Sequence, residues 1–117
     1  SPLMRWTIDA AGNGSLSVAD ENSAGGKGVQ RPMKQVTFRA GPEGYAKVRA
    51  ALVPAERYAG KEIPCKLEIT DMPYGSLHWG NLSTSFNRGC RSGEADAFQK
   101  AVEAALDHIV AFGKAAR

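Results

Sequence analysis

Apolar and polar residues alternate through the first forty positions, and this alternation is the pattern of a β-strand with one buried face. It runs over residues 5–10 and again over residues 15–20. The Gly-Asn-Gly segment at 12–14 lies between them and tolerates positive φ, so the sequence predicts a β-hairpin. A third strand is predicted at 33–40. The apolar positions of the three strands are Trp6, Ile8, Leu16, Val18, Val36, Phe38 and Ala40.

The alternation returns in the second half of the chain and predicts three more strands. Residues 65–70 have the pattern of a half-buried strand, and the composition of residues 71–75, Asp-Met-Pro-Tyr-Gly, predicts a turn. A hairpin is predicted over 76–86, with Gly80-Asn81 as its turn. The register that gathers its apolar side chains on one face pairs Trp79 with Leu82 and Leu77 with Thr84.

Two segments have the period of an amphipathic helix. The first opens at Gly41-Pro42, where the missing N–H of proline costs nothing, and it is predicted to end at Pro54. The second is predicted from residue 94 to about residue 112, with Ser92 as its N-cap. Acidic residues begin this helix and basic residues follow it, as the helix macrodipole favours. The apolar stripes consist of Tyr45, Val48 and Leu52 in the first helix and of Phe98, Ala101, Val102, Ala105, Leu106, Ile109 and Phe112 in the second.

The predicted order of elements is β-β-β-α-β-β-β-α. Runs of strands that are each closed by a helix indicate an α+β fold, with an antiparallel sheet of about six strands and two helices packed on one face. The length of 117 residues predicts a single domain over residues 1–117. Residues 21–32 form a polar, Gly-rich segment with nothing to bury, and we expect a flexible loop there.

Cys65 and Cys90 are the only cysteines, and they bracket the densest apolar stretch of the chain. An isolated pair predicts one structural disulfide and a protein that works outside the reducing cytosol. The alternative is two free, buried thiols in a cytosolic protein. In a meander of the last three strands the two residues would lie roughly 15–20 Å apart, whereas a disulfide needs Cα atoms within about 7 Å. Either the chain folds back after residue 87, or the strand order differs, or the bond is absent.

The net charge of +3 is spread along the chain instead of forming one basic stripe with aromatic residues, which argues against a nucleic-acid binder. No apolar run reaches the ~18–20 residues of a membrane-spanning helix, and no signal-peptide pattern is present. We expect a periplasmic or extracellular protein whose signal peptide or lipoprotein signal was removed. Met4 as a native start would instead favour the cytosol.

Motifs for catalysis, metals and nucleotides are missing from the sequence. There is no CxxC, HExxH, EF-hand loop or GxSxG, and no Ser or Thr follows Lys27 as a P-loop requires. His78 lies between Leu77 and Trp79, and His108 lies on the wetter side of its helix. We therefore expect no metal, no cofactor and no enzymatic activity. The alternative is an enzyme in which His78 activates a cysteine thiol.

The order of these features resembles that of a known group of proteins. The chain has a Gly-Asn-Gly hairpin, a strand, a short helix, Cys65, residues 70–74, Trp79, Gly89-Cys90 and a terminal amphipathic helix. This layout resembles small exported proteins and lipoproteins of alphaproteobacteria that have no assigned activity. It is also similar to emfourin-type inhibitors of secreted metalloproteases, although these do not depend on such a cysteine pair. The resemblance implies export and an inhibitory role, and it carries no site residues over.

The remaining candidate for function is the surface of the predicted turn at 71–75. Met and Tyr at a loop tip suit a protein contact, and Pro73 stiffens the loop, which lowers the cost of binding. We expect a non-enzymatic binding domain whose partner is a protein, such as a protease or an envelope protein. Alternatively, Tyr74 folds back over the core. The expected contact residues are Met72, Pro73 and Tyr74.

A second hypothesis assigns the protein to another class, a carrier of a small apolar ligand. It requires a pocket of about 300 Å³ or more between helix and sheet. The expected lining residues are Trp79, Phe86 and Phe98.

Overall fold

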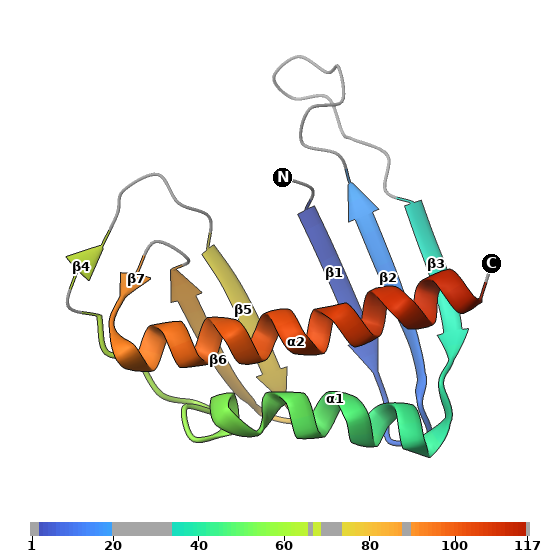
Figure 1. Ribbon diagram of the computed structural model, residues 1–117, viewed down its shortest axis with the longest axis horizontal. Helices are drawn as coiled ribbons and strands as arrows, with labels where there is room; N and C mark the ends of the chain where they lie inside the picture. The colour runs from blue at the N-terminus through green and yellow to red at the C-terminus, as the bar shows by residue number, and fades with distance from the viewer. Residues whose placement is uncertain (1–2, 20–33, 66, 69–73, 88–89, 117) are drawn as a thin grey trace, which may run out of the picture. The chain divides into compact units, whose positions relative to one another are not determined.

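The computed structural model describes residues 3–19, 34–65, 67–68, 74–87 and 90–116. The predicted loop at 21–32 and most of the predicted turn at 71–75 lie outside these residues. In chain order the elements are β1 (Leu3–Ile8), β2 (Asn13–Ala19), β3 (Lys34–Arg39), α1 (Gly41–Glu56), β4 (Leu67–Glu68), β5 (Tyr74–Trp79), β6 (Leu82–Asn87), β7 (Cys90–Arg91) and α2 (Gly93–Ala115) (Figure 1).

The elements belong to two compact units. The first unit consists of Ser1–Val48 and Leu106–Arg117, and the second unit consists of Arg49–Ala105. The α+β class and the antiparallel pairing are confirmed, but the prediction of one six-stranded sheet is wrong. The described strands form one sheet of three strands and two sheets of two strands. The assignment of residues 1–117 to a single domain stays a prediction.

The sheet of the first unit contains the predicted hairpin and the third strand, in the order β1-β2-β3 (Figure 1). Trp6 lies opposite Leu16, and Leu16 lies opposite Val36. The turn between β1 and β2 is closed by Asp9, whose Oδ1 accepts a hydrogen bond of 2.9 Å from the backbone N–H of Asn13. Gly12 has a φ of 87°, and a Cβ there would collide with the backbone of Gly41. The hairpin prediction is therefore confirmed, and its glycine has a conformational reason.

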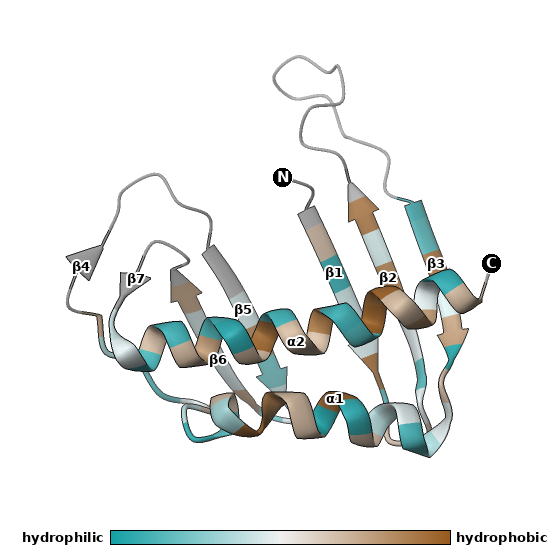
Figure 2. Cartoon of the chain, viewed as in Figure 1, coloured by the Kyte–Doolittle hydropathy of each residue, from teal (hydrophilic) through white to brown (hydrophobic). Residues whose placement is uncertain are grey.

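Hydrophobic and hydrophilic residues alternate along the strands of this sheet (Figure 2), and the register places the two sets on opposite faces. One face contains the buried residues Leu16 and Phe38, which are 7% and 4% exposed. Phe112, in the part of α2 that belongs to this unit, packs on Phe38 with ring centroids 5.5 Å apart. Gly113 lets the helix approach, because a Cβ there would lie 3.2 Å from Val36 Cγ1. The other face contains Arg5, Thr7, Asn13, Ser15, Ser17, Gln35, Thr37 and Arg39.

The hairpin of the second unit has the predicted register. Trp79 pairs with Leu82, and Leu77 pairs with Thr84. Gly80 in the turn has a φ of 55°. Leu77 and Thr84 are buried, but Leu82 is 52% exposed. Of the hairpin face that these two pairs share, the end at Leu77 and Thr84 therefore belongs to the core, and Leu82 at the turn does not.

The core of the second unit is aromatic. Phe98 of α2 is fully buried. Its ring centroid lies 5.1 Å from that of Phe86 and 6.1 Å from that of Tyr58. Burial of Ala101 follows the stripe expected for α2, and Ala95, which lies before the predicted stripe, is buried as well. Ser92 caps this helix by accepting a hydrogen bond of 3.0 Å from the N–H of Ala95, so the predicted N-cap is confirmed.

The predicted end of α1 is wrong, because the helix continues through Pro54 to Glu56. A proline this close to the end removes one backbone donor and leaves the final turn otherwise intact. Past the helix, the N–H of Tyr58 donates to the carbonyl of Ala55, and the N–H of Ala59 donates to that of Glu56. The last carbonyls of α1 are satisfied in this way, so the helix ends two residues later than the sequence predicts.

The strand predicted at 65–70 is described only at Leu67–Glu68, and it pairs with β7 instead of β5. The predicted turn at 71–75 is also too long, since Tyr74 and Gly75 already belong to β5. In the described part of the chain, no helix combines the length and the apolar character needed to cross a membrane.

Candidate functional site

The region around Cys65 lies beside the start of α2. In the antiparallel β4–β7 pair, Glu68 is opposite Cys90 and Leu67 is opposite Arg91. One step further along, the Ser92 hydroxyl donates a hydrogen bond of 2.6 Å to the carbonyl of Pro64. Residues 67–68 therefore run alongside residues 90–91, and Ser92 holds Pro64 beside the start of α2.

This pairing brings Cys65 and Cys90 closer than a meander would. In a meander the two residues would sit at opposite ends of the strands, but β4 pairs with β7, and Cys90 lies opposite Glu68, three residues along the chain from Cys65. Cys65 is bonded in a disulfide, and Cys90 is the only other cysteine of the chain. The side chain of Cys90 lies outside the described residues, so the pairing itself stays a prediction.

The predicted contact loop begins and ends at strands that are paired. Before it, Leu67–Glu68 pairs with β7, and after it, Tyr74 opens β5 opposite Asn87 of β6. Only residues 69–73 connect the two strands (Figure 1). Met72 and Pro73 lie outside the described residues, and so does the side chain of Tyr74, so the expected contact remains untested. The two strands at its ends nevertheless give the loop a defined base.

The pocket expected for an apolar ligand is filled at the place the sequence indicated. Phe98 is fully buried and packs edge to face or tilted against Tyr58 and Phe86. Trp79 is half-buried, and its indole Nε1 is buried with no hydrogen-bond partner among the described residues. These contacts form a packed core and argue against a ligand cavity lined by Phe86 and Phe98.

The two histidines lie in different settings. His78 is exposed in β5, where it is paired with Ser83. His108 is half-buried in α2, and its ring stacks on Phe112 with centroids 6.4 Å apart. Within the described residues, no group of three or more His, Cys, Asp or Glu side chains could hold a metal ion. Neither histidine has a described acidic or thiol partner that would indicate catalysis.

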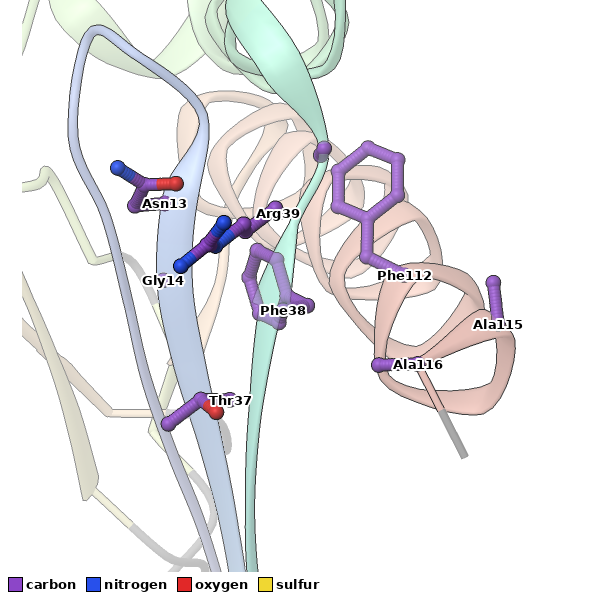
Figure 3. Close-up of a pocket in the computed structure, with 9 residues that line it drawn as sticks. Asn13, Gly14, Thr37, Phe38, Arg39, Phe112, Ala115 and Ala116 are labelled. Atoms are coloured by element: carbon purple, nitrogen blue, oxygen red, sulfur yellow. The ribbon is translucent and has the colours of Figure 1, made fainter.

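A cavity of about 850 Å³ lies in the first unit, beside the end of β3 (Figure 3). One side is formed by residues of β2 and β3 and by Ala40, and the other by the last turns of α2. Figure 3 shows Phe112, Ala115 and Ala116 on the helix side and Asn13, Thr37, Phe38 and Arg39 on the strand side. The rings of Phe38 and Phe112 pack against each other where the two sides meet. The lining residues are Asn13, Gly14, Thr37, Phe38, Arg39, Ala40, Phe112, Ala115 and Ala116.

The lining of this cavity is apolar on the helix side and cationic on the strand side. Phe112 is half-buried and Ala115 is exposed, so apolar surface remains accessible there. Arg39 is exposed and provides the one charge among the nine lining residues. No sequence motif marks this cavity, so it was not predicted. The sequence does indicate an edge strand at this place. The strand Lys-Gln-Val-Thr-Phe-Arg contains two basic residues and no acidic one, and charged side chains are common on edge strands.

Comparisons with family models, with curated proteins and with solved structures gave no match to this chain.

Proposed function

We propose that this protein is a non-enzymatic binding domain of the periplasm or the extracellular space, which holds a protein partner through Met72, Pro73 and Tyr74. The proposal rests on the hydrogen bonds at both ends of this loop. Before it, β4 pairs with β7 and the Ser92 hydroxyl donates to the carbonyl of Pro64; after it, Tyr74 begins a strand that pairs with β6. A loop held at both ends loses less conformational freedom on binding than a free one.

The disulfide at Cys65 supports the same proposal. It lies next to Pro64, the residue that accepts the hydrogen bond from Ser92, and so it braces the base of the loop. Structural disulfides persist in oxidising compartments and are rare in the cytosol. We infer that the domain works after export.

The compartment is tested by intact mass and thiol labelling of the unfolded, unreduced protein. We expect a mass two protons below that of the reduced chain, with no label taken up. Two labelled thiols would contradict the export proposal and would direct the next test to His78 beside a free thiol.

The binding role is tested by titrating the protein into assays of secreted metalloproteases, the class that the layout resemblance indicates. Truncation of a central aromatic contact typically costs 2 kcal/mol or more, so we expect Tyr74→Ala to weaken inhibition by roughly 30-fold. The matched control is Leu82→Ala, because Leu82 is an exposed apolar residue at the opposite end of the same hairpin. Full inhibition by Tyr74→Ala, or equal loss in both variants, would overturn the proposed contact.

A further inference from the structure

The outer edge of β3 presents backbone groups that β2 does not use. The N–H of Ala40 donates to the carbonyl of Gly12 at 2.8 Å, which continues the β2–β3 register by one pair. In an antiparallel ladder, bonded and non-bonded pairs alternate. Phe38, Val36 and Lys34 therefore direct their N–H and C=O groups to β2. The groups that point the other way belong to Gln35, Thr37 and Arg39.

A second hydrogen bond gives the same assignment independently. On the other side of β2, the N–H of Asp9 donates to the carbonyl of Asn13 at 2.9 Å. Asn13 and every second residue after it therefore bond toward β1, which leaves Gly14, Leu16 and Val18 to bond toward β3. Among the described strands, β2 is the one neighbour of β3. The edge is thus a row of hydrogen-bonding groups with no described strand beside it.

The cavity in Figure 3 includes the end of β3. Thr37–Ala40 line it together with Asn13 and Gly14 of β2 on the strand side, and Phe112, Ala115 and Ala116 line it on the helix side. An extended peptide placed there would direct alternate side chains to the two faces of the sheet. One set would meet Phe38, Phe112 and the end of α2, and the other set would meet Thr37 and Arg39.

The basic residues near the outer edge of β3 indicate the charge of the segment that could bind there. β3 contains Lys34 and Arg39 and no acidic residue, and none of the nine described residues that line the cavity carries a carboxylate side chain. Lys114 adds a basic side chain in the last turn of α2. A second copy of the chain would bring two such basic strands together, whereas an acidic strand would complement them.

We propose that the outer edge of β3 is a second binding site, which takes an extended segment of a partner protein by strand addition, with apolar residues alternating with acidic ones. Main-chain hydrogen bonds to Gln35, Thr37 and Arg39 hold the segment. Phe112 and the alanines of α2 receive its apolar side chains, and Arg39 pairs with its carboxylates. The site lies in the first unit and does not depend on the loop at 71–75.

The test uses the full chain and two fluorescein-labelled peptides of about eight residues, one alternating glutamate with valine and one alternating lysine with valine. Fluorescence anisotropy measures binding, and amide hydrogen exchange locates it. We expect the glutamate peptide to bind and to slow exchange at Thr37 and Arg39, and the lysine peptide to bind at least about tenfold more weakly. Equal binding of both peptides, or no binding of either at millimolar concentration, would overturn the proposal.

Variants of Thr37 separate the backbone from the side chain. Thr37→Pro removes an outward N–H and leaves the β2–β3 ladder intact, so affinity should fall about tenfold or more. The matched control Thr37→Ala keeps the N–H, and its affinity should stay within about twofold of that of the parent protein. Unchanged binding by a folded Thr37→Pro variant, judged by circular dichroism, would overturn strand addition.

Arg39→Glu keeps the proposal falsifiable if the proline variant does not fold. Arg39 is exposed, so its replacement leaves the core unchanged. The Arg39→Glu variant should bind the lysine peptide more tightly than the glutamate peptide.

Tyr74→Ala should bind the glutamate peptide as tightly as the parent protein does, which separates failure of this site from failure of the proposed loop. Sedimentation without peptide tests the second copy as occupant, and a dimer that Thr37→Pro dissociates would contradict the acidic segment.

Discussion

Two hydroxyl groups of the second unit connect residues that are far apart in the chain. Thr84 is 1% exposed, and its Oγ1 donates to the carbonyl of Tyr58 at 2.5 Å. Ser92 is 8% exposed, and it both caps α2 and donates to Pro64. Each hydroxyl donates to a backbone carbonyl in the connection that follows α1. The Thr84 bond is buried and adds to the bond that the Tyr58 carbonyl accepts from the N–H of Lys61, and the Ser92 bond holds Pro64 beside the start of α2.

Replacement of Thr84 by valine tests this role at a single residue. The side chain keeps its shape and loses its donor, so the carbonyl of Tyr58 keeps only the hydrogen bond of 2.9 Å from the N–H of Lys61. We expect Thr84→Val to lower the free energy of unfolding by about 0.5–1.5 kcal/mol, the net contribution of one hydrogen bond. Urea unfolding followed by circular dichroism measures the change. Ser85→Ala, at an exposed neighbouring position, is the control and should stay within about 0.5 kcal/mol; equal values would show that the hydroxyl contributes nothing.

At the scale of elements, close approach explains where the helices carry small residues. Gly113 faces Val36 and Leu16 of the sheet in its own unit, and a Cβ there would lie 3.2 Å from Val36 Cγ1 and 3.4 Å from Leu16 Cδ2. Gly93 opens α2, and a Cβ there would meet nothing within 4 Å. Close packing therefore requires glycine at position 113, whereas position 93 has room for a larger side chain.

This difference predicts opposite responses to substitution in one helix. Gly113→Val adds volume against packed side chains, and we expect it to destabilise the protein by about 1–3 kcal/mol. Gly93→Ala should be neutral or stabilise by up to about 1 kcal/mol, because alanine favours the helix. Thermal unfolding of both variants gives the comparison. A Gly113→Val protein as stable as the parent would mean that α2 does not pack closely on the sheet at this position.

At the scale of the whole molecule, the pairing of β4 with β7 links the segment after α1 to the segment before α2. It encloses the hairpin β5–β6 and the loop at 69–73. A bond between Cys65 and Cys90 would close the same stretch covalently. In the chain-entropy model the closure of 25 residues, the difference between positions 90 and 65, contributes about 3.5 kcal/mol, mainly by restricting the unfolded chain.

Removal of both thiols tests this contribution. We expect the double variant Cys65→Ser with Cys90→Ser to lose about 3.5 kcal/mol in free energy of unfolding, measured by urea denaturation without reductant. Reductant should destabilise the parent protein by a similar amount and leave the double variant unchanged. A parent protein that is insensitive to reductant would contradict a stabilising disulfide.

Local periodicity was sufficient for most elements, because a strand, a tight turn or a helix cap depends on residues within about four positions of one another. The register of the hairpin at Gly80-Asn81 and the N-cap at Ser92 were both predicted correctly. The end of α1 was not, because a proline in a last turn is tolerated when later residues satisfy the carbonyls. The contact loop could be proposed from composition, and its structure stays untested.

Composition and periodicity were enough to predict the α+β class, the alternating strands and the two amphipathic stripes. The division of the strands into separate sheets, the pairing of β4 with β7, and the cavity at the end of β3 could be seen only in the folded chain. Which strands pair depends on hydrogen bonds between residues distant in the chain, and the two edges of a strand look alike in its own pattern of side chains.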